Sequence, residues 1–155
     1  MNEIFGDMRH KEFEPRMNTN EHESESADGV IAAIVGAAYE VGNVLGAGFL
    51  EKVYENALAY EVRAAGLSAV QQYGAKVHYK DVLVGEYFVD LLINDVLLVE
   101  LKTVKALDDA HMPPGACPEE RMRCTNHLKA TGLQLCLLPN FGKPRQEIKP
   151  VAHGL

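Results

Sequence analysis

The sequence has few cysteines and no long apolar run, and each of these shortages excludes a class of protein. Its three cysteines, Cys117, Cys124 and Cys136, are odd in number and follow no disulfide-framework spacing, so we expect free thiols in a reducing compartment. No run of about 18 uncharged apolar residues suits a membrane-spanning helix. Residues 1–16 carry charges where a signal peptide has an apolar stretch. We therefore expect a cytoplasmic protein with no membrane partner.

The motifs of several other chemistries are also missing. No glycine-rich loop is followed by Lys and Ser or Thr, and no serine lies at a sharp strand-to-helix turn. These absences argue against a phosphate-loop nucleotide site and a serine hydrolase. No Cys-x-x-Cys pair occurs, and the irregular spacing of Cys117, Cys124, His127 and Cys136 gives little support for a zinc site.

The chain of 155 residues has a net charge of −7, and this charge is unevenly distributed. Residues 1–27 hold seven acids and three bases (−4), residues 28–100 hold ten acids and four bases (−6), and residues 101–155 hold five acids and eight bases (+3). Proteins that bind duplex DNA by bulk electrostatics are usually basic, so any contact with nucleic acid must be local. The bases that could form such a patch are Lys102, Lys105, Arg121, Arg123, Lys129, Lys143, Arg145 and Lys149. A solvated polar face is the other interpretation.

The length predicts one compact domain preceded by a tail. Residues 1–27 are polar, acidic and poor in apolar side chains, so they cannot bury enough surface to offset their ordering entropy. We expect a disordered acidic tail over residues 1–27 and a folded domain over residues 28–155.

Apolar residues at three- and four-residue spacing predict three helices. The first spans residues 28–45, with Asp28 as its N-cap, and the second spans residues 49–65 before Gly66. The third spans residues 119–131 and ends at Gly132. The side chains expected to point inward from the second helix are Leu50, Val53, Tyr54, Ala57, Leu58 and Val62.

Alternating or continuous apolar segments predict four strands, over residues 75–79, 83–93, 96–102 and 133–138. The run VLLV in the third segment is typical of a central strand that is covered on both faces. The segment 111–120 is rich in proline and glycine and is expected to be a loop. The order α, α, β, β, β, α, β indicates a single α/β domain with a mixed central sheet flanked by helices.

Asp90, Glu100 and Lys102 form the sharpest chemical pattern. Glu100 and Lys102 lie two apart on the third strand and therefore share a face of it. Asp90 and Glu100 offer the hard oxygen ligands that Mg²⁺ prefers, and Lys102 can orient or activate a water and stabilise charge on a phosphate. This combination suits metal-assisted cleavage of phosphodiesters.

The hairpin between the second and third strands tests this interpretation. A two-residue turn at Asn94 and Asp95 would set Asp90 opposite Val99 and direct Asp90 and Glu100 to opposite faces. A three-residue loop or a bulge would instead pair Asp90 with Glu100 on one face. We predict the second arrangement. The alternative is that Glu100 and Lys102 are only a surface ion pair and that Asp90 is merely solvated.

Gly48, Glu51 and Tyr54, in the segment GFLEKVY, match the signature Gly-x-x-Glu-x-x-Tyr. With the segments ALAYEVRAAGL, VELKTVKALDD, HLKATGLQL and LLPNFGKPRQEIK, the chain resembles the GxxExxY family of the PD-(D/E)XK nuclease superfamily from about Val30 to Leu155. The resemblance implies a restriction-endonuclease-like fold, a Mg²⁺ or Mn²⁺ cofactor and hydrolysis of nucleic acid, DNA in particular.

The resemblance also implies roles for individual residues. Asp90 takes the position of the superfamily's first acid, and Glu100 and Lys102 take its Glu-x-Lys pair. Asp90 and Glu100 would then bind the metal, with Lys102 as catalytic base or phosphate stabiliser and Glu51 as an auxiliary acid beside the sheet edge. The residues alone leave another interpretation open, in which Glu51 pairs with Lys52 or Lys102 to stabilise the fold and Tyr54 belongs to the core.

The chain departs from the family pattern at three places. The family has a Gln and, four residues later, a Tyr on the helix after its Glu-x-Lys strand, where this chain has Arg123 and His127. Arg123 only donates hydrogen bonds, so it can contact a phosphate but cannot replace the Gln. Residues 112–120 resemble an insertion that could displace His111. These departures keep open an alternative, a catalytically inactive domain that binds nucleic acid or protein through the same cleft.

Overall fold

The computed structural model describes residues 26–104 and 118–153. The expected acidic tail lies outside these residues except for its last two positions. His111, Cys117 and residues 112–117 of the expected insertion also lie outside them. The final part of that insertion is helical, because α4 (Pro118–Thr131) begins at Pro118. Proline is well tolerated in the first turn of a helix, where its missing N–H leaves no hydrogen bond unmade.

The three helices predicted from periodicity are present. In α2 (Ala27–Leu45) the N-cap is Ser26, whose hydroxyl accepts a hydrogen bond from the Gly29 N–H, so the prediction of Asp28 as N-cap is wrong. Asp28 lies in the first turn instead, where its negative charge interacts favourably with the positive end of the helix dipole. Ala27, the last residue of the predicted tail, is therefore the first residue of this helix, and Ser26 caps it.

Helix α3 (Glu51–Ala64) begins later than predicted, and its buried stripe is rotated. Leu50 precedes the helix and is 80% exposed, while Val53 is 38% exposed, so neither points inward as predicted. Tyr54 and Leu58 are buried as predicted, and Glu55 is buried beside them. The start of α3 thus brings a carboxylate into the interior and leaves apolar side chains outside.

Five strands form one mixed sheet in the order β1-β2-β3-β4-β5. They are β1 (Ala69–Tyr79), β2 (Val82–Ile93), β3 (Leu97–Val99), β4 (Leu135–Asn140) and β5 (Glu147–Ala152). All neighbours are antiparallel except β3 and β4, which are parallel and are joined through α4. The short apolar strand β3 is central, as its sequence predicted.

Strand β5 was not predicted from the sequence. It pairs with β4 at one edge of the sheet and contains Pro150, which faces Leu137 in the register. Proline weakens the sequence signal of a strand, yet an edge strand tolerates it because one side of its backbone has no partner. The strand depends on its long-range partner more than on its own pattern.

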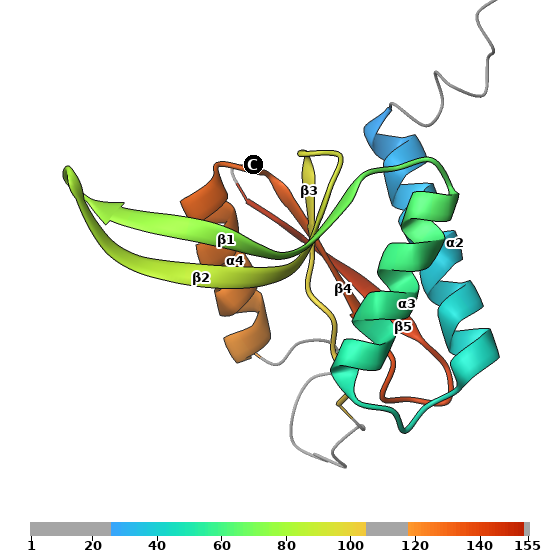
Figure 1. The fold of residues 1–155 in the computed structure, drawn as a ribbon. Coiled ribbons are helices and arrows are strands. Elements are labelled where there is room, and N and C mark those ends of the chain that lie inside the picture. The colour runs from blue at the N-terminus through green and yellow to red at the C-terminus, as the bar shows by residue number, and fades with distance from the viewer. Residues whose placement is uncertain (1–25, 105–117, 154–155) are drawn as a thin grey trace, which may run out of the picture.

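The helices cover the two faces of the sheet unequally (Figure 1). Helices α2 and α3 pack on one face, and the buried cluster there contains Ile34, Leu58, Val99 and Leu101. Helix α4 packs on the other face, where a smaller cluster contains Cys124, Leu128, Leu98 and Cys136. The hairpin formed by β1 and β2 extends away from α2 and α3 and alongside α4. The sheet therefore has helices on both faces, as the predicted α/β class requires.

Helix α2 is long and apolar enough to cross a membrane by length and composition alone. Its buried residues include Val30, Ile34, Ala38 and Val41, which belong to the cluster beneath α2 and α3. This stripe at three- and four-residue spacing is typical of an amphipathic helix that packs on a sheet.

Candidate active site

The register of β2 and β3 confirms the predicted three-residue hairpin loop. Ile93 pairs with Leu97 and Leu91 pairs with Val99, so residues 94–96 form the loop. Asn94 and Asp95 take left-handed backbone angles there, with φ of 47° and 58°. Continuing the same register by one pair sets Asp90 opposite Glu100. The loop therefore allows the two acids to meet, as the metal-site interpretation requires.

Asp90 is half-buried on β2 and is held from the next strand. Its Oδ2 accepts a hydrogen bond from the Leu101 N–H at 2.8 Å. Burial and the nearby carboxylate of Glu100 raise the pKa of Asp90 to about 6, although the Leu101 hydrogen bond lowers it and Glu51 and Glu55 add smaller increases. Burial is thus the main reason that the charged form of Asp90 is disfavoured, and the neighbouring acids add to it.

Strand β3 ends at Val99, earlier than the predicted 102, so Glu100 directly follows the strand; it is only 1% exposed. Its Oε1 lies 2.7 Å from Nδ1 of His127 on α4, and this ring is also 1% exposed. The contact is at ion-pair distance but lacks hydrogen-bond geometry, and neither atom has another hydrogen-bond partner among the described residues. Burying a carboxylate is costly without a partner, so His127 positions Glu100. The surface ion pair with Lys102 considered above is thus wrong for Glu100.

Glu51, Lys102 and Arg123 complete the group from three different elements. Burial is the main cause of the raised pKa of Glu51, while Lys102 and Arg123 lower this pKa and Glu100 raises it. These mutual effects place the positive and negative groups close to one another. The described residues give neither Glu51 nor Lys102 an ion pair within 4 Å. Both side chains are therefore available to a ligand.

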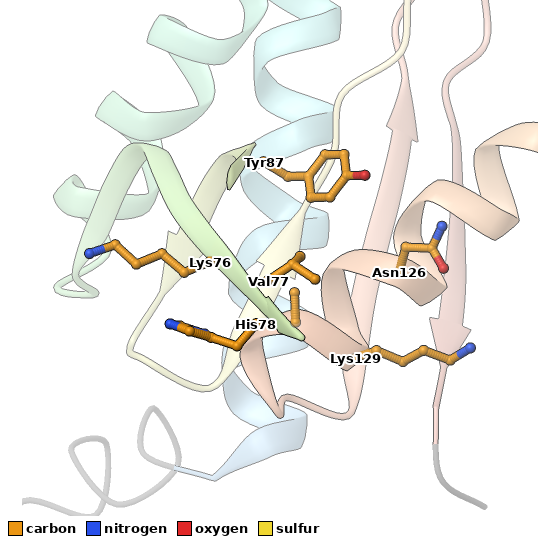
Figure 2. Close-up of a pocket in the computed structure, with 7 residues that line it drawn as sticks. Lys76, Val77, His78, Tyr87, Asn126 and Lys129 are labelled. Carbon is orange, nitrogen blue, oxygen red and sulfur yellow. The ribbon is translucent and has the colours of Figure 1, made fainter. Parts of the chain in front are cut away.

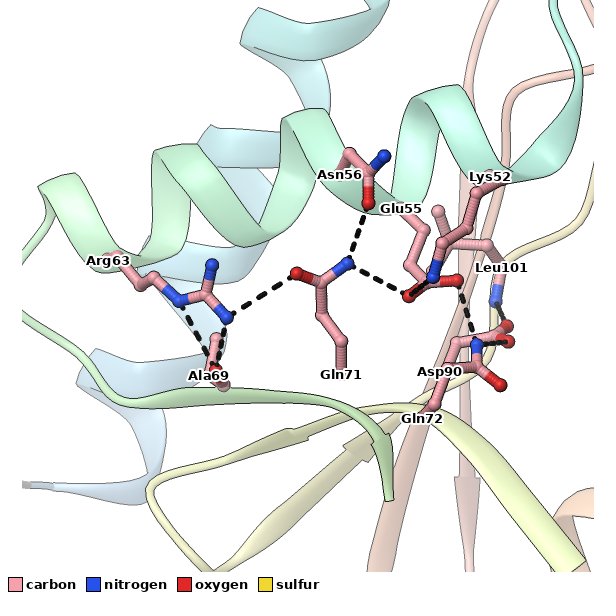
Figure 3. Close-up of polar contacts among 9 residues, drawn as sticks. All are labelled: Lys52, Glu55, Asn56, Arg63, Ala69, Gln71, Gln72, Asp90 and Leu101. Carbon is pink, nitrogen blue, oxygen red and sulfur yellow. Dashed lines mark hydrogen bonds and ion pairs between the residues drawn. The ribbon is translucent and has the colours of Figure 1, made fainter.

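Glu55 is a site residue that the sequence reasoning missed. It is 3% exposed, and Lys52 Nζ contacts its Oε1 at 2.7 Å, so Lys52 pairs with Glu55 and not with Glu51. The amide nitrogens of Gln71 and Gln72 donate hydrogen bonds to Glu55 at 3.0 and 2.9 Å (Figure 3). The available signal was its position four residues after Glu51, on the same face of the helix.

Gln72 links this buried network to Asp90. Its amide nitrogen lies 3.5 Å from Oδ1 of Asp90 as well as bonding Glu55 (Figure 3). Its backbone is left-handed, with φ of 52°, at the position opposite Asp90 in the β1–β2 register. Such a conformation in a residue other than glycine is strained and is common at functional sites. The hydrogen bonds of Gln72 to Glu55 and Asp90 therefore connect β1 to both acids.

The Gly-x-x-Glu-x-x-Tyr motif builds the entry to α3. Tyr54 is fully buried, its hydroxyl donates to the Gly46 carbonyl at 2.6 Å, and the Phe49 N–H donates to that hydroxyl at 3.2 Å. Its ring stacks on Phe141 with centroids 4.7 Å apart. Gly48 has a φ of 115°, which favours glycine. Tyr54 is therefore a core residue, and only Glu51 of the motif belongs to the site.

Tyr54→Phe should lower the free energy of unfolding by about 1–2 kcal/mol, because the Gly46 carbonyl and the Phe49 N–H lose their partner. Urea denaturation followed by circular dichroism measures this loss. Tyr60→Phe on the exposed side of α3 is the matched control and should change stability little. Equal effects of the two substitutions would contradict the structural role of the Tyr54 hydroxyl.

The acids of the site fit a divalent cation by their chemistry. No three His, Cys, Asp or Glu side chains are gathered as a ready metal cage within residues 26–104 and 118–153. Mg²⁺ does not need one, because it usually keeps several waters and binds one or two carboxylates together with substrate phosphate. Asp90 and Glu100 supply such oxygens, and the raised pKa of Asp90 and the orphaned Oε1 of Glu100 indicate negative charge that a cation would compensate.

Comparisons with known proteins bear on the family and the fold. A sequence profile described as the PD-(D/E)XK nuclease superfamily matches residues 28–151. No curated protein shows significant similarity to the chain. The crystal structure of SSO0001 has a TM-score of 0.51 and 13% identity to this protein, over 88% of this chain and 62% of that chain. The chain therefore spans less than two thirds of the length of SSO0001, and the likeness confirms the predicted restriction-endonuclease-like fold alone.

Proposed function

The chain belongs to the PD-(D/E)XK nuclease superfamily, and from this premise we propose that it is a metal-dependent nuclease that hydrolyses phosphodiester bonds of DNA. The observation that supports the proposal is the three-residue hairpin loop, whose register, continued by one pair, sets Asp90 opposite Glu100, together with the pKa of Asp90, which burial and the acidic neighbour raise to about 6. Within the superfamily we assign the chain to the GxxExxY family, on Gly48, Glu51 and Tyr54.

In this proposal Asp90 and Glu100 hold Mg²⁺ or Mn²⁺. When bound, such a cation supplies positive charge beside the scissile phosphate and favours deprotonation of water. Lys102 orients the attacking water or stabilises the charge that develops on the phosphate. Glu51 acts as an auxiliary acid at the start of α3, and Arg123 contacts a phosphate with its guanidinium. Water attacks in line, and the leaving oxygen takes up a proton.

A second function, binding without cleavage, is favoured by one observation. The carboxylate of Glu100 faces His127 at 2.7 Å and is nearly inaccessible, so His127 competes with a cation for the same oxygen. Arg123 also favours this second function, because a guanidinium cannot accept a hydrogen bond. In that case the cleft would hold nucleic acid or a protein without cutting it.

Digestion assays separate the two functions. Purified protein is incubated with single-stranded DNA, duplex DNA or RNA in Mg²⁺, Mn²⁺ or EDTA, and the products are resolved on denaturing gels. We expect cleavage of DNA in the presence of either metal and none in EDTA. Lys102→Ala should lower the rate by about 100-fold, because it removes a group that stabilises the transition state.

Lys143→Ala is the matched control for Lys102→Ala, since Lys143 pairs with Glu147 at the start of β5. It should leave the cleavage rate within about twofold of the unmodified protein. Metal-dependent cleavage that survives Lys102→Ala unchanged would contradict the assigned site. Binding to DNA without cleavage under any condition would establish the second function.

A further inference from the structure

A hollow of about 440 Å³ lies between α4 and the β1–β2 hairpin, outside the group of acids. We call it the α4–hairpin groove. In Figure 2, Val77 of β1 and Tyr87 of β2 point toward α4, which carries Asn126 and Lys129, whereas the side chains of Lys76 and His78 on β1 extend away from α4. No acid is among the described residues that line the groove. Its volume falls within the range of about 300–1,000 Å³ that is usual for small-ligand sites.

The groove adjoins the acids through two side-chain contacts. The Tyr87 ring lies 5.6 Å from the His127 ring, and His127 lies 2.7 Å from Glu100. Tyr87 is 51% exposed, so part of its aromatic surface is open to a ligand. A ligand in the groove would therefore lie next to a group bound at Glu100.

Helix α4 also connects the acids to the groove. Arg123, Asn126 and Lys129 are exposed and lie three residues apart, on adjacent positions of one helix surface. Arg123 lowers the pKa of Glu51 and so belongs to the acid group, while Asn126 and Lys129 line the groove. We call Arg123, Asn126 and Lys129 the stripe; it extends about 9 Å along the helix axis, at roughly 1.5 Å per residue.

We propose that the α4–hairpin groove binds an unpaired nucleotide of a single-stranded nucleic acid that passes through the site. The proposal rests on the nuclease function proposed above and adds a substrate class, a strand that is single-stranded beside the cleaved bond. Lys129 contacts a phosphate, Asn126 hydrogen-bonds a base, and the exposed face of Tyr87 stacks on that base. Aromatic stacking suits unpaired bases, because every base offers a π-face once it leaves a duplex.

The charges around the groove are compatible with this ligand. Lys76 lies opposite Glu86 in the β1–β2 register, and its side chain extends away from α4 in Figure 2. Lys129 has no ion pair within 4 Å in the described part of the chain. Lys129 is therefore the cation that the experiment should remove.

Binding is measured in a Lys102→Ala background without added metal, by fluorescence anisotropy of a labelled single-stranded oligonucleotide and of a blunt duplex. Asn126→Ala/Lys129→Ala should weaken single-strand binding about tenfold and reduce the slope of log K against log salt by about 0.7, the value for one lost phosphate contact. Both substitutions replace exposed helical residues with alanine, so the fold should persist. Blunt duplex binding should change less than twofold.

Arg121→Ala is the matched control, because it removes one exposed charge from the same helix away from the stripe. An equal loss in Arg121→Ala and in the groove variant would indicate bulk electrostatics and would overturn the proposal. Displacement of the oligonucleotide by polyglutamate at equal charge would also overturn it in favour of an acidic peptide.

Unchanged binding in the groove variant, with a parent protein that still cleaves, would reject the groove alone. A parent protein that neither binds nor cleaves nucleic acid would reject the nuclease function and the groove together.

Discussion

Asp90→Asn should abolish metal-dependent cleavage and, at the same time, stabilise the fold at neutral pH. The rate should fall by about 10³-fold, since a cation's stabilisation of the transition state is worth several kcal/mol and each 1.36 kcal/mol is a factor of ten. The stability gain follows from the raised pKa of Asp90, because its charged form is disfavoured in the folded protein. Asparagine is neutral at every pH and can still accept the Leu101 N–H hydrogen bond.

The sign of the pH dependence is fixed by this pKa. Between its ordinary pKa of 3.8 and about 6, the folded protein binds a proton at Asp90 that the unfolded chain has released. The free energy of unfolding therefore falls as the pH rises through this interval and is constant above it. Asp90→Asn should match the parent below pH 4 and exceed it above pH 6 by about 1–2 kcal/mol, a value reduced for the partial exposure of the carboxylate.

Urea denaturation at pH 4 and pH 7.5, in EDTA so that no cation offsets the charge, measures this difference. Asp81→Asn is the control, because Asp81 is an exposed acid in the turn of the β1–β2 hairpin. It should show no comparable difference between the two pH values. A lower stability of Asp90→Asn at pH 7.5 would mean that the charged Asp90 serves the fold through Leu101, and the functional interpretation would fail.

Much of the fold could be predicted because it follows from local patterns. The apolar stripe of α2 and the continuous apolar run of β3 are visible in short windows, and the loop at Asn94 and Asp95 fixes the register that brings Asp90 opposite Glu100. Strand β5 was missed because Pro150 interrupts it and its partner is β4 rather than a neighbour in sequence. Local windows carry no information about such pairing.

Candidate site residues could be proposed from the sequence only where they repeat a known pattern. Asp90, Glu100, Lys102 and Glu51 have characteristic spacings, whereas the partners of Glu55 lie 16 and 17 residues away on β1. The contact between Glu100 and His127 joins two elements across the sheet face and has no sequence spacing that would indicate it. Residues that support a site from other elements are therefore found from coordinates rather than from motifs.

His127→Ala should be the most destabilising single change near the site. It leaves the carboxylate of Glu100, which is 1% exposed, without the side chain that faces it at 2.7 Å. Leaving a buried polar group without its partner costs about 1–3 kcal/mol, and more where the group is charged, which is a large part of the stability of a small domain. Urea denaturation at pH 7 in EDTA measures the loss. His127→Gln retains a hydrogen-bond donor and should lose about half as much or less.

Two further variants identify the cause of this loss. Adding Glu100→Gln to His127→Ala removes the unpaired charge, so the double variant should recover about 2 kcal/mol relative to His127→Ala. No recovery would mean that His127 acts by packing alone, against Tyr87 on the α4 side of the sheet.

Metal addition connects this measurement to function. If Glu100 shares a divalent cation with Asp90, Mg²⁺ should stabilise His127→Ala more than the parent, because the cation then replaces the lost partner of a buried charge. Saturation at 100 times the dissociation constant corresponds to about 2.7 kcal/mol. The Glu100→Gln/His127→Ala variant should lose this extra stabilisation. Equal effects of Mg²⁺ on all three proteins would place the cation away from Glu100, so the orphaned Oε1 would then have to be explained by His127 alone.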